Sequence, residues 1–325
     1  MECVPRERVS RSVGTIGIEI GGSVLRIGLV SKDGKIVRST RKDSSALRDQ
    51  STASRILLDE ITDFLGDRSC EGIGVAMAGL VDNERRMMVL ASNLGWRDFP
   101  LGDEIAELTG LPVVTDKDTN MAALGELHAG AGRGLDSFVY VTLGTGAGGS
   151  VIYDQRLIRG IGNRGGEFGH IYSGGDKVCG CGLTGCLETW AGAVWIGSRA
   201  REIVQSGCQS QMLSLAGSVE DIDSRIVVQA AEQRDQPAKA ILADAAEAVG
   251  VALLNAVRMI YPQAVIIGGS IGGIREFIFK PIKDFVETNS VLPGTGLPPV
   301  RVLPAELGDT AAMIGAGLSV FGETA

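Results

Sequence analysis

Residues 160–190 carry the most specific pattern in the chain, GIGNRGGEFGHIYSGGDKVCGCGLTGCLETW. The segment contains one of the chain's two histidines and three of its six cysteines. They follow the spacing H-x8-C-x-C-x4-C, as His170, Cys179, Cys181 and Cys186. One imidazole and three thiolates form a complete tetrahedral ligand set for Zn²⁺ and leave no position open for chemistry, so the spacing predicts a structural zinc site.

Two other interpretations of these cysteines are weaker. Three buried thiols beside a surface histidine would need apolar cover, and a segment this rich in glycine offers little. A disulfide is disfavoured because the number of cysteines is odd and Cys179 and Cys181 are too close in sequence to pair easily. Glu167 and Glu188 flank the cluster, so a bound metal would also fix where these two carboxylates point.

The same segment resembles the signature of the ROK family (repressors, open reading frames and sugar kinases). The matching residues are 166–170 (GEFGH), 179–182 (CGCG) and 185–188 (GCLE). The resemblance implies a two-domain α/β fold of the actin-like ATPase (ribonuclease H-like) class, built from duplicated βββαβα halves with a cleft between them. It also implies an activity, the transfer of the γ-phosphoryl group of ATP to a sugar hydroxyl.

Two segments of the chain agree with a duplicated fold. In residues 14–40, alternating apolar residues predict two strands around a Gly-Gly-Ser turn, and a turn at 33–34 leads into a third strand. Residues 138–158 repeat this order around a Gly-Thr-Gly turn and a tight turn at 154–155. A further buried strand, 264–268, ends in glycines. The resemblance implies that these turns bind ATP through Glu19, Gly21, Gly22, Ser23, Gly144, Thr145, Gly146, Gly268 and Gly269.

Position 19 departs from the family pattern. The family has an aspartate there, whereas this chain has Glu19. The carboxylate is kept on a side chain one methylene longer, which is compatible with holding Mg²⁺ through water.

A second polar segment, residues 111–126, reads LPVVTDKDTNMAALGE and predicts a strand followed by a helix from near Thr119. A carboxylate at the end of such a strand is a common catalytic position and an equally common helix N-cap. Asp116, Asp118 and Thr119 could each be a cap. The segment resembles the family's E-N-D-A-N motif, which implies that Asp118 is the catalytic base and that Lys117 replaces a sugar-binding asparagine.

The resemblance also implies a sugar site. Its expected residues are Asn93, Lys117, Asp118, Glu167, His170 and Glu188. By position alone, Asn93 could equally be an ordinary turn residue. Lys117 could be a solvated surface lysine, or it could set specificity, because an ammonium only donates hydrogen bonds whereas an asparagine also accepts them. In the second case it would disfavour a ligand with its own ammonium there and shift specificity from plain glucose.

The expected sugar is glucose at its 6-hydroxyl, the commonest substrate of the family. N-acetylmannosamine, fructose, allose, amino sugars and cyclitols are the alternatives. A catalytically silent sugar-binding protein is a further alternative, which only Glu19 and Lys117 favour.

The remaining pattern divides the chain into two domains. We expect a smaller N-terminal domain at 14–118, completed by a C-terminal helix within 305–325, and a larger domain with the zinc loop at 119–304. Helical periodicity predicts helices at 48–65, 101–109, 198–205, 224–233, 238–260, 275–288 and 310–321. Residues 209–223 are polar and predict an irregular surface segment.

Composition excludes several classes of protein. The net charge of −8 argues against a general nucleic-acid binder. Repressors of the family carry an added N-terminal winged helix-turn-helix, and only about a dozen residues precede the first strand here, so we expect no DNA partner. We find no apolar run of membrane-spanning length and no secretory leader, and Cys3, Cys70 and Cys208 are scattered, which predicts a cytoplasmic protein. The expected partners are a sugar, ATP and further copies of the chain, as a homodimer or higher oligomer.

Overall fold

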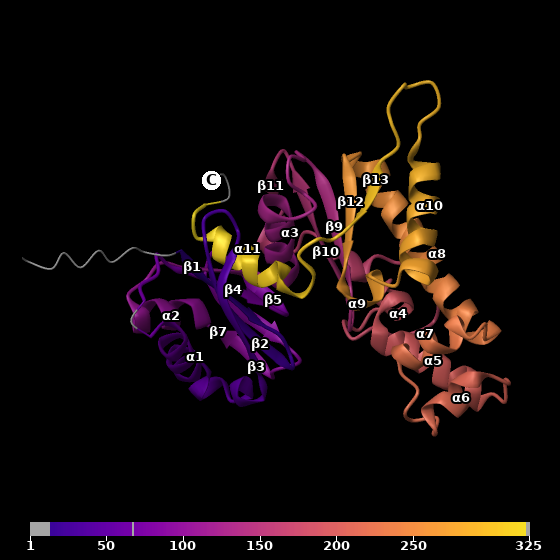
Figure 1. Ribbon diagram of the computed structural model, residues 1–325, viewed down its shortest axis with the longest axis horizontal. Coiled ribbons are helices and arrows are strands. Elements are labelled where there is room, and N and C mark those ends of the chain that lie inside the picture. The colour runs from indigo at the N-terminus through magenta and orange to yellow at the C-terminus, as the bar shows by residue number, and fades with distance from the viewer. Residues whose placement is uncertain (1–13, 67, 323–325) are drawn as a thin grey trace, which may run out of the picture. The chain divides into compact units, whose positions relative to one another are not determined.

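The computed structural model describes residues 14–66 and 68–322, so the N-terminal lead with Cys3 lies outside the described residues. The chain forms two compact units (Figure 1). The first ends at Gly130 and resumes at Thr310, and the second runs from Ala131 to Asp309. The division therefore falls after residue 130, whereas we expected it after residue 118.

The first unit contains a five-stranded sheet with the order β3-β2-β1-β4-β8. Strands β1 and β2 form an antiparallel hairpin, and β1, β4 and β8 run parallel. One face of the sheet carries Ile16, Ile18 and Ile20, which are fully or almost fully buried in a core with helices α1 and α2. The bounds are β1 Thr15–Ile20, β2 Val24–Val30, β3 Ile36–Asp43, β4 Ile73–Met77, β8 Val113–Lys117, α1 Gln50–Leu65 and α2 Leu101–Thr109.

The second unit repeats this plan. Its five-stranded sheet has the order β11-β10-β9-β12-β13, with an antiparallel hairpin β9–β10 and parallel pairs β9–β12 and β12–β13. The tight turn between β10 and β11 holds Asp154 and Gln155 at positive φ. The duplication expected from the sequence is therefore present. The bounds are β9 Phe138–Leu143, β10 Ala147–Tyr153, β11 Arg156–Leu157, β12 Ala264–Gly268 and β13 Arg301–Pro304.

Helices α3 (Asp118–Ala129) and α11 (Ala311–Ser319) cover the other face of the first sheet. They pack closely enough that a Cβ at Gly315 would overlap the carbonyl oxygen of Met121, and one at Gly125 would overlap that of Ala311. Gly17 and Gly74 allow α11 the same approach to β1 and β4. This contact places α3 in the first unit, so the boundary between the two units lies after the last turn of α3.

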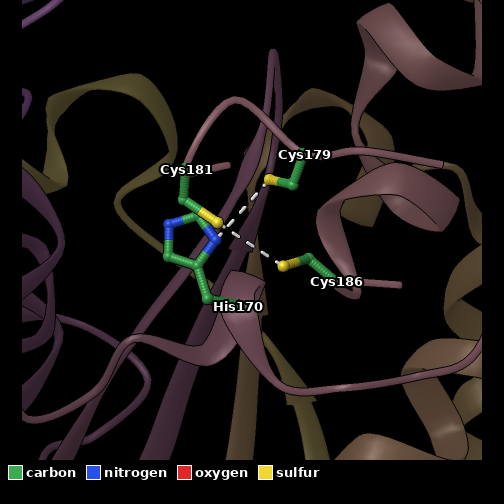
Figure 2. Close-up of side chains that lie close together, drawn as sticks. All are labelled: His170, Cys179, Cys181 and Cys186. Atoms are coloured by element: carbon green, nitrogen blue, oxygen red, sulfur yellow. Dashed lines mark hydrogen bonds between the residues drawn. The ribbon is translucent and has the colours of Figure 1, made fainter. Parts of the chain in front are cut away.

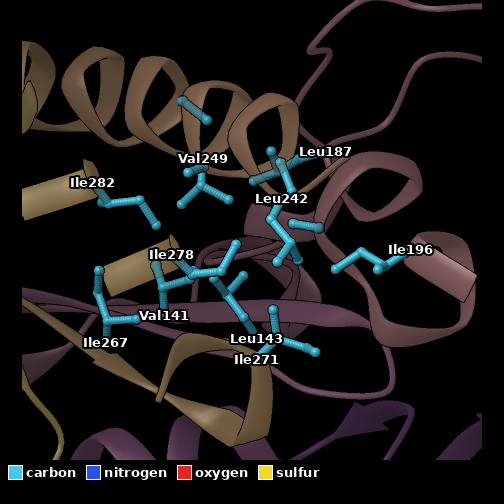
Figure 3. Packing of buried hydrophobic residues seen from close by; sticks show 14 of the residues in the cluster. Val141, Leu143, Leu187, Ile196, Leu242, Val249, Ile267, Ile271, Ile278 and Ile282 are labelled. Atoms are coloured by element: carbon cyan, nitrogen blue, oxygen red, sulfur yellow. The ribbon is translucent and has the colours of Figure 1, made fainter. Parts of the chain in front are cut away.

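The second unit is mainly helical beyond its sheet, and Figure 3 shows part of its core. Its longest helix, α8 (Gln236–Ile260), is long and apolar enough to cross a membrane by length and composition, but half of that window is buried inside the protein. Leu242 and Val249 of α8 lie in the core with Ile267 of β12. The other long helices are α5 Ala193–Gln205, α7 Ser224–Glu232 and α10 Lys280–Ser290, the last preceded by the π-helical turn η4 Arg275–Phe279.

Two regions differ from the expectation. Residues 80–99 form a small antiparallel sheet, β5 Leu80–Asp82, β6 Met87–Ala91 and β7 Trp96–Phe99, for which the sequence pattern predicted no strands. The prediction of an irregular segment at 209–223 was wrong in part, because it contains helix α6, Gln211–Ala216. The Ser210 hydroxyl accepts the amide of Met212, whose side chain is fully buried.

The remaining elements are short and mostly border the loops. They are η1 Ser45–Arg48, η2 Ile161–Asn163, η3 Phe168–His170, α4 Glu188–Ala191, α9 Gly269–Gly272 and η5 Gly308–Thr310.

Gly315→Ala tests the packing of α11 on α3. Alanine normally stabilises a helix relative to glycine, but here the added methyl group would overlap the Met121 carbonyl. We expect the free energy of unfolding to fall by about 1–3 kcal/mol, the usual cost of overpacking. Gly273→Ala is the control, because its nearest neighbour would lie at 3.5 Å. Equal stability of both variants in thermal and urea unfolding would refute the contact.

Candidate functional site

The first glycine turn is held by backbone and side-chain hydrogen bonds within the first unit. The Gly21 N–H donates to the Val24 carbonyl oxygen at 2.9 Å, and the Ser44 hydroxyl donates to the Gly21 carbonyl at 2.9 Å. Gly22 lies against Asn93, since a Cβ at Gly22 would be 2.7 Å from the Asn93 Cβ. A predicted nucleotide-binding residue and a predicted sugar-binding residue are therefore neighbours.

Glu19 and Arg26 form an ion pair directly below this turn. Arg26 Nη1 donates to Glu19 Oε2 at 3.0 Å, and the two side chains are only 15% and 19% exposed. The two residues face each other across the β1–β2 hairpin. Sequence reasoning missed Arg26, although counting the hairpin register outward from the Gly-Gly-Ser turn would have found it.

The polar segment at the end of β8 separates its two aspartates. Asp116 is fully buried, and its Oδ1 accepts the Lys117 amide at 2.7 Å and Asn120 Nδ2 at 2.8 Å. Asp118 is half-buried, begins α3 and accepts the Thr119 amide at 2.8 Å. The N-cap of α3 is Lys117, which makes no side-chain cap bond. Asp116 thus stabilises the junction between β8 and α3 through these hydrogen bonds. Helix α3 begins one residue earlier than the sequence predicted.

Lys117 is not a surface residue. Only 4% of it is exposed, so the interpretation as a solvated lysine was wrong. Burying an ammonium is costly unless it is paired and hydrogen-bonded. The burial of Lys117 therefore favours a specific role over that of a surface lysine.

The four expected metal ligands gather in one place (Figure 2). Their ligand atoms all lie within 4.8 Å of one another. Cys179 Sγ is 3.7 Å from His170 Nδ1, and Cys181 Sγ is 3.6 Å from Cys186 Sγ. A tetrahedral zinc with Zn–S bonds of about 2.3 Å places its sulfur atoms about 3.8 Å apart, so the donor set fits this ion.

The backbone of residues 168–188 brings these ligands together without a disulfide among them. His170 ends the 3-10 turn η3, and β-bridges join Tyr172 to Cys186 and residue 178 to residue 184. Gly182 and Gly185 have φ values of 88° and 78°, which glycine adopts without strain. Cys179 and Cys186 are buried after all, while Cys181 is exposed.

The thiols differ in their readiness to ionise. Burial, and in addition the carboxylate of Glu188, raise the pKa of Cys179 to about 12. Burial alone would raise the pKa of Cys181, but hydrogen bonds from the Leu183 amide and the neighbouring thiols outweigh it and lower that pKa. Cys179 therefore needs a cation to become a thiolate at neutral pH. A metal bound here would displace protons, so its affinity falls as the pH falls.

Glu188 connects the cysteine cluster to the second glycine turn. Its Oε1 accepts the Cys179 thiol at 3.4 Å, and its Oε2 accepts the Ala147 amide at 3.1 Å. A Cβ at Gly146 would overlap that Oε2 atom. The turn is also anchored at its start, where the Ala193 amide donates to the Gly144 carbonyl at 2.9 Å. The position of Glu188 thus depends on both the cluster and the turn.

The other predicted residues of the second unit occupy the ends of its central strands. Gly269 has a φ of 84° and lies against the Leu143 carbonyl at the end of β9, where the second glycine turn begins. A Cβ at Gly268 would be 2.9 Å from the Tyr140 hydroxyl. Glu167 is half-buried, and its carbonyl accepts the His170 amide at 3.0 Å.

The predicted residues are divided between the two units. Asn93, Lys117, Asp118 and the first glycine turn belong to the first unit. Glu167, the metal cluster, Glu188, the second glycine turn and Gly268-Gly269 belong to the second.

The sequence from residue 15 to residue 321 matches the model of the ROK family, and the chain belongs to that family. It is 32% identical to a glucokinase of Halalkalibacterium halodurans over 309 residues, which cover 93% of each chain. Among solved structures, it is similar to a ROK family glucokinase from Streptomyces griseus in complex with glucose and AMPPNP. That likeness has a TM-score of 0.80 at 31% identity and covers 94% of this chain and 98% of the other. The actin-like ATPase fold expected from the sequence is thereby confirmed.

The family also contains regulators. A xylose repressor of Caldicellulosiruptor bescii is 28% identical over 292 residues, which cover 88% of this chain and 73% of the repressor.

Gly146→Ala tests the link between Glu188 and the second turn. The added methyl group would occupy the place of Glu188 Oε2, so the carboxylate must leave the Ala147 amide. Because the displaced group is the end of a flexible side chain, the cost is that of the lost hydrogen bond from the Ala147 amide and not of overpacking, and we expect the free energy of unfolding to fall by about 1–3 kcal/mol. A crystal structure should show a displaced Glu188. Gly144→Ala in the same turn meets nothing within 4 Å and should keep its stability. An unmoved Glu188 in the Gly146 variant would contradict the link.

Proposed function

We propose that this chain is an ATP-dependent sugar kinase that transfers the γ-phosphoryl group of ATP to the 6-hydroxyl of glucose. The observation that carries the proposal is the placement of Asp118. It is a half-buried carboxylate at the end of β8, in a family member whose relatives include glucokinases. The neighbouring Asp116 is bound by Lys117 N–H and Asn120 and is unsuited to take a proton from a substrate.

The reaction needs little covalent chemistry from the protein. Asp118 accepts the proton of the sugar hydroxyl. The hydroxyl oxygen forms a bond to the γ-phosphorus of ATP, and the bond between that phosphorus and the ADP oxygen breaks. Amides at 22–23 and 145–146 donate to the phosphates, while the Gly21 and Gly144 amides hold the two turns in shape, and Gly268 and Gly269 leave room for the adenosine. Mg²⁺, when bound, neutralises phosphate charge, and Glu19 would hold it through water.

Five further residues would surround the sugar: Asn93, Lys117, Glu167, His170 and Glu188. Carboxylates suit a ligand with many hydroxyl donors, because charge-assisted hydrogen bonds are about twice as strong as neutral ones. His170 can serve both roles, since Nδ1 faces Cys179 and the ring has a second nitrogen.

Lys117 is the proposed specificity residue. As a buried donor it suits a sugar that presents lone pairs and disfavours an amino sugar with a free ammonium. N-acetylmannosamine, fructose, allose and cyclitols are the acceptors to compare with glucose.

The second candidate function is sugar binding without turnover. It is favoured by the ion pair of Glu19 with Arg26, which engages a carboxylate expected to serve Mg²⁺. Formation of ADP in the presence of a sugar separates the two functions.

The metal cluster is proposed as a structural zinc site. The support is the donor set of one imidazole and three thiols and their mutual distances. The zinc would fix Cys186, two residues before Glu188 in the chain, and so would brace both a sugar contact and the second glycine turn.

We also propose a cytoplasmic homo-oligomer. The second unit has exposed apolar side chains on the segment with the cysteines and on α8, among them Tyr172, Val178, Leu183, Val251 and Met259. Contact with a second copy would remove this apolar surface from water. Analytical ultracentrifugation should show a dimer or larger species, and a monomer at micromolar concentration would contradict this.

Asp118→Asn tests the base. The amide keeps the shape of the carboxylate but cannot accept the proton, so kcat should fall by about 10²–10⁴-fold. Glucose affinity and thermal stability should change little. Asp103→Asn, which alters an exposed carboxylate of α2, should retain full turnover. Near-normal kcat in the Asp118 variant would assign the proton to another group.

Elemental analysis tests the zinc. Protein purified without added metal should contain one zinc ion per chain. Cys181→Ser should lose zinc and lower both the melting temperature and the glucose affinity, because Glu188 loses its brace. Cys208→Ser, at an exposed thiol outside the cluster, should change neither. Zinc at background level in the wild-type protein would refute the site.

A further inference from the structure

The three cysteines of the candidate metal cluster differ in their access to solvent. Cys181 is exposed, whereas Cys179 and Cys186 are only 3% and 1% exposed. Cys181 lies in a tight turn, in which the Cys179 amide donates to the Leu183 carbonyl at 2.8 Å and the Gly182 amide donates to the Cys179 carbonyl at 2.8 Å. A small solute that reaches the cluster from solvent therefore meets Cys181 first.

The thiol of Cys186 lies next to the exposed one. Cys181 Sγ is 3.6 Å from Cys186 Sγ (Figure 2). The Cys179 thiol is engaged elsewhere, since it donates to Glu188 Oε1 at 3.4 Å and lies 3.7 Å from His170 Nδ1. An exposed cysteine thus has a buried thiol within short reach.

The backbone around this pair allows the two sulfur atoms to come closer. A disulfide needs a sulfur–sulfur distance of about 2.05 Å. Cys186 is held in place, because its carbonyl accepts the Thr189 amide at 3.0 Å and the Thr189 hydroxyl at 2.8 Å. Cys181 has open space beside it, since a Cβ added at Gly180 or Gly182 would meet nothing within 4 Å. Cys181 can therefore move toward Cys186.

The other cysteines that the structure describes lack one of these two properties. Cys70 is buried, at 8% exposure. Cys208 is exposed, but its thiol contacts the Gln209 carbonyl oxygen, and no second thiol of the described residues lies within hydrogen-bonding distance of it. Among the described residues, exposure and a neighbouring thiol coincide at Cys181.

We propose that Cys181 is a site of reversible oxidation by hydrogen peroxide, with Cys186 as the thiol that completes a disulfide. The Cys181 sulfur takes one oxygen atom from the peroxide and becomes a sulfenic acid, while the O–O bond breaks and one water leaves. The Cys186 sulfur then attacks the Cys181 sulfur. The S–S bond forms, the S–O bond breaks, and the hydroxyl group leaves with the Cys186 proton as a second water. Two thiols are thereby oxidised to one disulfide, and one peroxide is reduced to two waters.

The disulfide would remove two of the four ligands proposed for zinc. In a zinc-bound protein the same two sulfur atoms react as thiolates, and solvent supplies the two protons. His170 and Cys179 remain, and two ligands do not complete a tetrahedral site, so the metal is released. Glu188, two residues after Cys186, then loses its brace. Metal release rests on the proposed zinc site, whereas the disulfide needs only the two thiols.

Peptide mapping of the wild-type protein tests the disulfide. Trypsin cleaves after Lys177 and Arg199, so a single peptide, 178–199, carries all three cysteines. After treatment with hydrogen peroxide and alkylation of free thiols, this peptide should contain a disulfide between Cys181 and Cys186 and one alkyl group on Cys179. Dithiothreitol should restore three alkylated cysteines. A disulfide that includes Cys179, a sulfinic acid at Cys181 without a disulfide, or an unchanged peptide would overturn the proposal.

Cys186→Ser separates the roles of the two thiols. Without the second thiol, the sulfenic acid at Cys181 should persist and be captured by dimedone. Cys208→Ser is the control and should form the same disulfide as the wild type, because Cys208 lies outside the cluster. If Cys186→Ser does not fold, dimedone added to the wild-type protein during oxidation gives the same assignment. Capture at Cys208 without capture at Cys181 would refute Cys181 as the reactive thiol.

Zinc release is followed with the absorbance of 4-(2-pyridylazo)resorcinol during the same oxidation. One zinc ion should leave for each disulfide formed, and zinc retained by fully oxidised protein would contradict the release. A wild-type protein without zinc would refute the zinc site and leave the peptide map as the test of the disulfide. None of these measurements needs phosphoryl transfer, so their failure is distinguishable from failure of the kinase function.

Discussion

Helix α11 approaches the backbone of β1, β4 and α3 very closely, and the first unit depends on that approach. Glycines at positions 17, 74, 125 and 315 remove the side chains that would keep the helix away from β1, β4 and α3. Helix α11 thereby covers one face of the first sheet and positions α3, whose first residue is Asp118. A carboxylate proposed as a catalytic base is thus placed by a contact between segments far apart in the sequence.

The second unit positions its residues by a different means. Its core of long helices and β-strands is apolar and continuous, but the segment with His170 and the cysteines has few core residues of its own. Hydrogen bonds of Glu188 to Cys179 and Ala147 join that segment to the second glycine turn. A metal at the cluster would therefore also influence Glu188 and the second glycine turn.

Much of the fold could be predicted from local pattern. The two hairpins with glycine turns, the buried strand at 264–268 and helix α8 have periodicities or turn residues that identify them. The small sheet at 80–99 escaped prediction because its short strands are interrupted by polar turns. Helix α6 has few buried apolar residues, so its pattern is weak. The assignment of α3 to the first unit depends on glycine contacts between helices, which no local pattern reveals.

Within the candidate site, the sequence predicted the metal cluster but not the pairing of Arg26 or the burial of Lys117. The cysteine and histidine spacing was enough to predict the cluster, because all four ligands lie within one short loop. Arg26 was missed because its pairing with Glu19 is a property of strand register. The burial of Lys117 depends on elements that surround the end of β8, so its sequence position could not separate a surface lysine from a site residue.

The most direct measurement is the product formed by the purified wild-type protein from ATP, Mg²⁺ and glucose, identified by ³¹P NMR and mass spectrometry. A glucose kinase of the proposed kind yields glucose 6-phosphate and ADP in equal amounts. Glucose binding without ADP formation, repeated across the sugar panel, would contradict the proposal and identify a sugar-binding protein without turnover.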